Sequence, residues 1–237
     1  MNVTPVLPSE IGKMGFAMVP GVIGQETIAN LIQQIAAVAD ENSPRVGGRS
    51  GYALRHLAHL VPAVKALAEA PEILTLAETV LGPTTFLVRS LFFDKTPEAN
   101  WKVAWHQDLT IAVQNKIEVP GYNSWSMKDG VHHVQPPVSV LERMLTIRFH
   151  LDDCNQTNGA LQVLPGSHLT GRLGAAQISE WRAKTESVVC AVPAGGALLM
   201  RPLLLHASSP ALTPNHRRVI HLEYAADSLP AGLQWVI

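Results

Sequence analysis

Residues 144–168 read MLTIRFHLDDCNQTNGALQVLPGSH, and this stretch decides the fold class. It holds two short runs rich in branched and aromatic apolar residues, Met144–Leu151 and Ala160–Leu164. Turn-forming residues follow each run: Asn158-Gly159 after the first and Pro165-Gly166-Ser167 after the second. Short apolar runs separated by such clusters are typical of the strands of a β-sandwich or β-barrel.

Short apolar runs separated by turn-forming residues also occur on both sides of this stretch. The further runs of this kind are Phe86–Asp94, Ser187–Val192, Ala197–Leu205 and Val219–Tyr224. No regular alternation of strands with helices appears among them, which argues against a doubly wound parallel sheet.

The first third of the chain is helical in character. Apolar residues at helical spacing predict an amphipathic helix over residues 25–39. Residues 61–81 predict one or two more helices, which are interrupted at Pro71 and ended by Gly82-Pro83. We therefore expect a mainly β protein of the α+β class, folded as a single domain over residues 1–237.

The composition excludes several function classes. Of the 237 residues, 47% are hydrophobic and only 16% are charged, so the chain is not disordered. A formal net charge of −1 offers no electrostatic footprint for nucleic acid, and the apolar stretch at residues 188–200 is too short to cross a bilayer. Residues 1–5 lack the features of a secretory signal, and Cys154 and Cys190 are expected to be reduced thiols. We therefore expect a cytoplasmic protein that binds neither nucleic acid nor membrane.

Residues 114–140 do not show short apolar runs like those of the predicted strands, because turn-forming pairs recur along their whole length. A long segment of this composition inside a compact domain is often an active-site lid. In that role Trp125 would provide an apolar wall, and His132 or His133 would provide a polar contact with the substrate.

Ten histidines are the one unusual feature of the composition. Residues i and i+2 of an extended chain point to the same side, so His106 and Asp108 can offer an imidazole nitrogen and a carboxylate oxygen to one ion. Far downstream, His206 ends an apolar run that begins at Met200. A buried polar group at that point needs a partner, which is either a metal ion or the backbone.

Two histidines and one carboxylate form the ligand set of non-haem Fe(II) oxygenases, in which other coordination positions stay open. Zinc would more often take three or four firm protein ligands. The remaining candidates among the histidines, His56, His59 and His168, are expected to have structural or surface roles.

Two adjacent arginines, Arg217 and Arg218, can each clamp a carboxylate through two hydrogen bonds. In a strand, Arg217 shares one face with His221 and Glu223, whereas Arg218 shares the other face with large apolar residues. If helices cover the apolar face, the polar face lines the interior of the barrel. This argument favours Arg217 as the residue that points inward, with Arg218 as the alternative.

Taken together, these residues resemble the phytanoyl-CoA dioxygenase family of Fe(II)- and 2-oxoglutarate-dependent oxygenases. The resemblance covers most of the chain, from about residue 15 to residue 226. It rests, in chain order, on Gly15-Phe16 with Val19-Pro20, His106-Gln107-Asp108, Asn158–Leu161, Leu164–His168, and Pro202–Ser208 followed by Arg217.

The resemblance implies a double-stranded β-helix, the jelly-roll fold of cupin-like proteins, with N-terminal helices packed on one sheet. It implies Fe(II) held by His106, Asp108 and His206, and 2-oxoglutarate bound by Arg217 and the hydroxyl of Ser208. The implied reaction consumes O2 and 2-oxoglutarate, releases succinate and CO2, and hydroxylates a small molecule. Halogenating relatives lack the carboxylate that Asp108 provides, so its presence favours hydroxylation.

Several points stay open at this stage. The substrate cannot be read from the residues; the candidates for contact with it are Gln107, Trp125, His132, His133 and Arg148. Arg148 and Arg89 could instead form structural ion pairs. Desaturation and demethylation are alternative outcomes of the same chemistry, and a homodimer is one assembly that the sequence allows.

Two other functions were weighed. The first is a cupin-like metal enzyme that does not use 2-oxoglutarate, such as an isomerase or a ring-cleaving dioxygenase; Arg217 argues against it, and a measurement of succinate production would decide. The second is a catalytically silent jelly-roll binding module; the intact set of His106, Asp108 and His206 argues against it, and an absence of bound iron would favour it.

Overall fold

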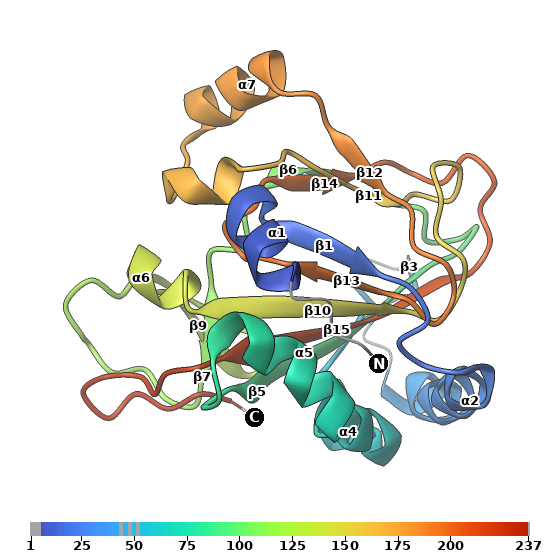
Figure 1. The fold of residues 1–237 in the computed structure, drawn as a ribbon. Helices are drawn as coiled ribbons and strands as arrows, with labels where there is room; N and C mark the ends of the chain where they lie inside the picture. The colour runs from blue at the N-terminus through green and yellow to red at the C-terminus, as the bar shows by residue number, and fades with distance from the viewer. Residues whose placement is uncertain (1–5, 43–44, 47–48, 51–52, 237) are drawn as a thin grey trace.

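The computed structural model describes residues 6–42, 45–46, 49–50 and 53–236. Two antiparallel sheets face each other and form its centre (Figure 1). The strand order is β1-β13-β10-β15-β5-β4 in the larger sheet and β12-β11-β14-β6 in the smaller one. This arrangement is the double-stranded β-helix that the resemblance implied, and that expectation is confirmed.

The larger sheet consists of β1 (Phe16–Val19), β4 (Ala53–Arg55), β5 (Phe86–Lys95), β10 (Met144–His150), β13 (Ala197–Met200) and β15 (Arg217–Ala225). The smaller sheet consists of β6 (Val103–His106), β11 (Leu161–Val163), β12 (Val188–Cys190) and β14 (His206–Ser208). A third sheet contains β7 (Ile111–Val113), β8 (Asn123–Lys128) and β9 (Val131–Gln135), and β2 (Arg45–Val46) pairs with β3 (Arg49–Ser50). The helices are α1 (Leu7–Met14), α2 (Gln25–Asn42), α3 (Leu57–Leu60), α4 (Pro62–Ala68), α5 (Pro71–Leu81), α6 (Val138–Leu141) and α7 (Ala175–Lys184), with a 3₁₀ turn at Ser167–Thr170.

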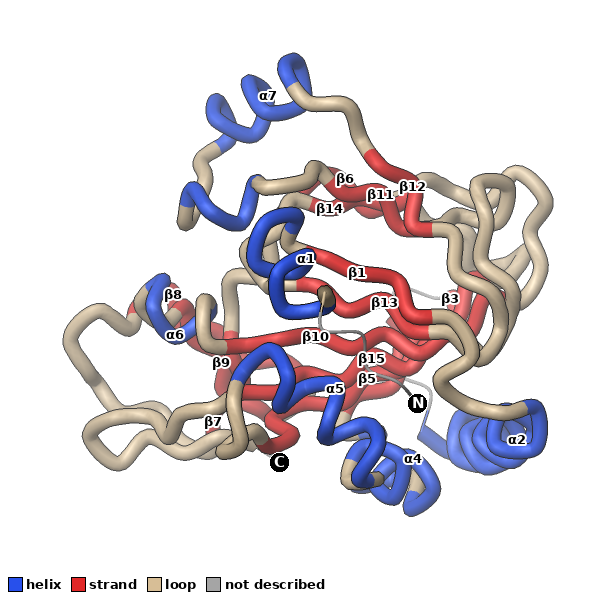
Figure 2. Tube along the Cα trace, in the orientation of Figure 1, coloured by secondary structure: helices blue, strands red, loops and turns tan. Residues whose placement is uncertain are grey.

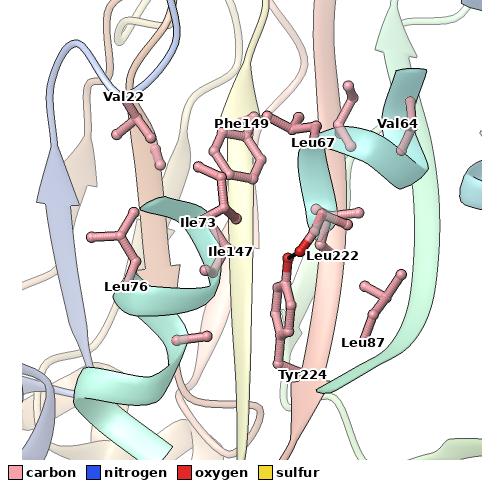
Figure 3. Close-up of a cluster of buried hydrophobic side chains, with 14 of the residues drawn as sticks. Val22, Val64, Leu67, Ile73, Leu76, Leu87, Ile147, Phe149, Leu222 and Tyr224 are labelled. Atoms are coloured by element: carbon pink, nitrogen blue, oxygen red, sulfur yellow. Dashed lines mark hydrogen bonds between the residues drawn. The ribbon is translucent and has the colours of Figure 1, made fainter. Parts of the chain in front are cut away.

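Helices α2, α4 and α5 cover the outer face of the larger sheet (Figures 1 and 2). From β10, Ile147 and Phe149 pack into this layer, and Leu222 and Tyr224 do so from β15 (Figure 3). The hydroxyl of Tyr224 donates a hydrogen bond of 3.0 Å to the carbonyl of Ala68. Because side chains alternate along a strand, the residues between these apolar ones face the smaller sheet. The predicted division of the last strand into an apolar outer face and a polar inner face is therefore confirmed.

One predicted strand is wrong. The apolar run over residues 197–205 is not continuous: β13 ends at Met200 in the larger sheet, and β14 begins at His206 in the smaller sheet. Residues 201–205 form the crossing between the sheets, where Pro202 has no N–H for a strand ladder. Leu203 to Leu205 are buried in that crossing, so their apolar character reflects burial and not a strand.

The predicted helices over residues 25–39 and 61–81 correspond to α2 and to α4 with α5. The sequence analysis did not identify α1, β1 or α7. None of the described helices combines the length and the apolar character that crossing a membrane requires.

Two of the motifs on which the resemblance rests contact each other at the start of β1, through Gly15 and His168. Gly15 ends α1 with φ of 86°, and a Cβ atom there would lie 2.5 Å from Nδ1 of His168. The other ring nitrogen of His168 lies 3.2 Å from the carbonyl oxygen of Gly12, to which it donates. His168 therefore has the structural role expected of it, and Gly15 is required by the close approach of its ring.

Candidate functional site

The three predicted metal ligands meet at the edge of the smaller sheet. His106 ends β6 and His206 begins β14, and the two residues are direct partners in the antiparallel pairing of these strands. Their ring centroids lie 4.2 Å apart. Asp108 follows β6, and its backbone N–H donates to the carbonyl of Pro202 at 2.9 Å, which holds it beside the crossing that leads into β14.

The ligand atoms of this triad all lie within 4.8 Å of one another. Nε2 of His106 is 3.8 Å from Oδ1 of Asp108, and Nε2 of His206 is 3.6 Å from Oδ2. Each imidazole places its Nδ1 against a backbone carbonyl, that of Ala104 at 2.8 Å for His106 and that of Leu204 at 2.9 Å for His206. A carbonyl accepts only, so these contacts assign the proton to Nδ1 and leave a lone pair on each Nε2.

The triad thus brings together two imidazole lone pairs and a carboxylate, all of which are hydrogen-bond acceptors. Such a group is satisfied by a cation and not by its own members. Burial alone would raise the pKa of Asp108, but the neighbouring histidines, above all His206, lower it. Burial lowers the pKa of His206 to about 4. At neutral pH Asp108 is therefore a carboxylate and His206 a neutral imidazole, the protonation states in which these two side chains can bind Fe(II).

The triad lines a cavity of about 230 Å³ between the two sheets. Hollows of about 440 and 580 Å³ lie elsewhere on the surface, and neither is lined by a residue of the triad. The small volume of the cavity limits what it can hold to small molecules.

One end of this cavity gathers hydrogen-bond donors. Arg217 and Ser208 line it, and Lys95 lies directly behind them, opposite Arg217 in the β5–β15 pairing. Nζ of Lys95 donates to Oγ of Ser208 at 3.0 Å and to the carbonyl of Ser209 at 2.7 Å. Because the Ser208 hydroxyl accepts from Lys95, its own proton is free to point into the cavity.

Two buried arginines near this end lack a carboxylate partner. Nη1 of Arg217 donates to the carbonyl of Gly159 at 2.5 Å, and Nη1 of Arg148 donates to Nδ1 of His221 at 2.9 Å. The Nε atoms of both arginines are buried without a hydrogen-bond partner, and neither side chain forms an ion pair with a described residue. Both guanidinium groups therefore keep donors that no described carboxylate uses, and a buried donor of this kind calls for an acceptor.

The motif Asn158-Gly159 has its place in this arrangement. Gly159 has φ of 80°, and a Cβ atom there would lie 2.9 Å from the carbonyl oxygen of Ser209 and 3.2 Å from Nζ of Lys95. Only glycine lets the backbone pass so close, which is how its carbonyl reaches Arg217.

Arg218 takes no part in the cavity. It forms a two-point ion pair with Asp152, with distances of 2.6 Å from Nη2 and 2.9 Å from Nε. The face that the sequence analysis favoured for Arg217 is therefore the face that the structure turns inward.

The other end of the cavity carries charges of both signs. Arg89 of β5 and Glu223 of β15 are partners in the sheet, with 3.0 Å between Nη1 and Oε1. His221 lies 3.2 Å from the same carboxylate through Nε2 and accepts from Arg148 through Nδ1. A continuous chain of polar contacts therefore crosses the inner face of the larger sheet from Arg148 to Arg89.

Gln107 does not reach the cavity. Its amide nitrogen donates to the carbonyls of Gly171 at 2.8 Å and Leu203 at 2.6 Å, and its oxygen accepts from the N–H of Leu173 at 2.8 Å. The expectation that Gln107 contacts the substrate is not met, because the backbone occupies its amide. Of the predicted substrate contacts, Arg148 alone lines the cavity.

Residues 114–140 form most of the third sheet, and their three predicted contact residues also lie outside the cavity wall. Trp125 packs on a separate apolar cluster, with its ring 6.4 Å from that of His132. His133 is buried, with Nδ1 3.1 Å from the carbonyl of Val131, and burial lowers its pKa to about 4. These side chains stabilise the hairpin itself, so the expectation that they contact the substrate is not met in this structure.

The turn of that hairpin does reach the site. Asp129, between β8 and β9, forms an ion pair with Arg55, which lines the cavity at its mouth. Burial lowers the pKa of the neighbouring Lys128, and the charges of Arg89 and Arg55 lower it further. The tip of the insertion therefore lies beside the opening.

Four residues of the site were missed by the sequence analysis or left without a role in it: Arg55, Lys95, His221 and Glu223. The signal that could have found Lys95 is alternation along β5, which places it on the same face as Arg89. Arg55 belongs to a strand of three residues, which has no sequence pattern of its own.

The chain is similar to known proteins both in sequence and in fold. The model of the phytanoyl-CoA dioxygenase (PhyH) family matches residues 12–219. L-proline trans-4-hydroxylase of Streptomyces griseoviridis is 26% identical over 252 aligned positions, which cover 93% of this chain and 86% of the hydroxylase.

Among solved structures, the non-heme alpha ketoglutarate dependent carbocyclase SnoK from nogalamycin biosynthesis superposes with a TM-score of 0.73 at 17% identity. That superposition covers 94% of this chain and 84% of SnoK. EctD from S. alaskensis with bound Fe superposes with a TM-score of 0.72 at 18% identity, covering 95% and 79% of the two chains. These two likenesses concern the fold.

Proposed function

Because this chain belongs to the phytanoyl-CoA dioxygenase family, we propose that it hydroxylates a small molecule with iron held by His106, Asp108 and His206. It is an Fe(II)- and 2-oxoglutarate-dependent oxygenase. The observation that carries the assignment of the site is the meeting of three acceptor side chains in one cavity with Arg217.

Bound iron and 2-oxoglutarate supply the oxidising chemistry, in which O2 is consumed and 2-oxoglutarate becomes succinate and CO2. Arg217 and Ser208 bind the carboxylate of 2-oxoglutarate that lies away from the metal. Lys95 orients the Ser208 hydroxyl and adds positive charge, because burial and the charge of Arg217 lower its pKa only to about 8. The Nδ1 contacts of the two histidines fix their rings, so that both Nε2 atoms face the ion.

The insertion has a role in this proposal as the lid of the site. Its turn, with Lys128 and Asp129, closes the mouth of the cavity, and the ion pair between Asp129 and Arg55 holds it there. Closure excludes water from the site, and a site free of water favours oxidation of the substrate over unproductive consumption of 2-oxoglutarate.

A spectroscopic titration tests this assignment. 2-Oxoglutarate that chelates Fe(II) produces a visible charge-transfer band, so the band should develop when 2-oxoglutarate is added to the anaerobic Fe(II) protein. The band should be absent from the His206→Ala variant. A cupin-like enzyme without this co-substrate would bind iron yet give no band, and a silent module would bind no iron. A cytoplasmic location and a homodimer stay predictions from the sequence.

A further inference from the structure

We propose that the substrate of this enzyme carries a free carboxylate, which is bound by Arg89 and Arg55 at the end of the cavity remote from Arg217. This inference rests on the proposed function, and it names the class of molecule that the oxidation acts on. Its basis is a second pair of arginines in the same cavity, which iron and 2-oxoglutarate leave unused and which keep free hydrogen-bond donors.

The two ends are separated along one strand. Arg89 and Lys95 both belong to β5 and point to its inner face, six residues apart, which corresponds to about 20 Å of extended chain. Lys95 is opposite Arg217, and Arg89 is opposite Glu223. A small dicarboxylate bound at Arg217 and at the triad therefore does not reach Arg89.

At the remote end, Arg89 and Arg55 have N–H groups without a described hydrogen-bond partner. Arg89 donates from Nη1 to Glu223, and to the described residues it makes no other hydrogen bond. Arg55 donates from Nε to Asp129, which leaves the outer nitrogens of its guanidinium without a described partner. Since Arg55 is the sheet partner of Leu91, it is the diagonal neighbour of Arg89 on the same face, within reach of its long side chain.

The net charge of the side chains around the cavity also favours a substrate with a carboxylate. The cavity is lined by four arginines, Arg55, Arg89, Arg148 and Arg217, and by two carboxylates, Asp108 and Glu223. Lys95 behind Arg217 and Asp129 against Arg55 also belong to the count, so that five positive charges less three negative ones leave an excess of two over the whole cavity. Fe(II) with the 2-oxoglutarate dianion adds no net charge. A carboxylate on the substrate offsets this excess, whereas a neutral or cationic substrate leaves it in place.

The structure already shows a carboxylate at this place. Asp129 from the tip of the insertion contacts Arg55 at the mouth. In the complex, Asp129 keeps its bond to Nε and so positions the guanidinium, while the outer nitrogens bind the substrate. Arg89 and Arg55 are then determinants of specificity, and Asp129 is a positioning residue.

The test is a binding experiment on the full-length protein, loaded anaerobically with Fe(II) and 2-oxoglutarate. Calorimetry measures the dissociation constants of the twenty standard amino acids and of straight-chain carboxylates with two to six carbons. The dissociation constant of each acid is compared with that of its primary amide. We expect acids that bind to do so about ten-fold or more tightly than their amides, since a hydrogen bond to a charged group is lost in the amide. We expect Arg55→Gln and Arg89→Gln to remove that advantage and to leave the dissociation constant of 2-oxoglutarate within about two-fold of its wild-type value.

Arg143→Gln is the matched control, because Arg143 pairs with exposed Asp227 away from the cavity. Arg89→Gln leaves buried Glu223 without its cation; if that protein does not fold, Arg55→Gln decides, since the Arg55 side chain is 32% exposed. The inference is overturned if no acid binds, if amides bind as tightly as acids, or if Arg55→Gln leaves the preference intact. Weakened binding of 2-oxoglutarate in Arg55→Gln also overturns it. Failure of the wild type to bind 2-oxoglutarate counts instead against the proposed function.

Discussion

His106 and His206 are directly opposed on neighbouring strands, with 4.2 Å between their ring centroids, although they come from distant parts of the sequence. A shift of one residue in the β6–β14 register would turn one of the imidazoles to the other face of the sheet. The metal site therefore depends on the strand pairing as much as on the identity of its ligands.

The first prediction concerns the metal. The wild-type protein should bind one Fe(II) per chain, and His106→Ala or His206→Ala should abolish turnover because each removes one of three ligands. Asp108→Gly should abolish hydroxylation yet retain weak iron binding through the two histidines. Iron content after anaerobic desalting, measured beside succinate formation, checks both statements; full activity after chelation and dialysis into metal-free buffer would contradict them.

The second prediction concerns the co-substrate. Arg217→Ala should weaken 2-oxoglutarate binding by about thirty-fold to several thousand-fold, since the loss of one partner of a desolvated charge pair costs about 2–5 kcal/mol. Arg218→Ala is the matched control on the adjacent residue: it loses the two-point ion pair with Asp152 outside the cavity and should bind 2-oxoglutarate normally. Calorimetric dissociation constants decide, and a large effect at Arg218 with none at Arg217 would reverse the assignment.

The third prediction concerns acid sensitivity. His150 is buried, and neither ring nitrogen has a hydrogen-bond partner among the residues that the structure describes; burial, with the charges of Arg148 and Arg217, lowers its pKa to about 3. An unfolded histidine titrates at about 6.5, so the stability that neutral His150 contributes is complete above that pH. As the pH falls from about 6.5 towards 3, the unfolded chain takes up a proton that the folded chain does not. The free energy of unfolding should therefore fall by about 1.4 kcal/mol per pH unit from this residue.

Urea unfolding of the metal-free protein at several pH values between 7 and 4.5 measures that slope. His150→Leu should flatten it by about 1.4 kcal/mol per pH unit. His133, whose pKa is lowered to about 4 by burial, should contribute in the same direction, so His133→Leu should flatten the slope in part. Equal slopes in the wild type and in both variants would show that these histidines are protonated in the folded state.

The fourth prediction concerns the lid. Asp129→Asn weakens the contact that holds the turn of the insertion against Arg55. With a substrate in hand, this variant should raise the KM and the amount of succinate formed per product, while the dissociation constant of 2-oxoglutarate stays unchanged. Trp125→Ala provides the comparison, because Trp125 packs on the apolar cluster outside the cavity and its loss should lower thermal stability more than coupling. Unchanged KM and coupling in Asp129→Asn would rule out the lid.

The positions that could be predicted from the sequence are those that belong to a periodic pattern or to a motif. Alternation along the last strand placed Arg217 inward and Arg218 outward, and helical spacing located α2, α4 and α5. His106, Asp108 and His206 were found because their residue types and order match a metal-binding set.

The residues that were missed or given the wrong role depend on contacts that no local pattern records. Gln107 lies between two candidate ligands in the sequence, yet three backbone groups from distant loops bind its amide. Arg55 and Asp129 acquire their roles from each other, across the mouth of the cavity. The apolar run at residues 197–205 was taken for one strand because burial in a crossing and burial in a sheet select the same residues.

The central claim is that one cavity, built from the triad and Arg217, consumes 2-oxoglutarate. Its most direct test is the amount of succinate formed from 2-oxoglutarate by the Fe(II)-loaded protein in air, compared between the wild type and His206→Ala at equal folded concentration. We predict succinate from the wild type that depends on both iron and O2, and none above background from His206→Ala. Undiminished succinate from His206→Ala, or none from the iron-loaded wild type, would contradict the claim.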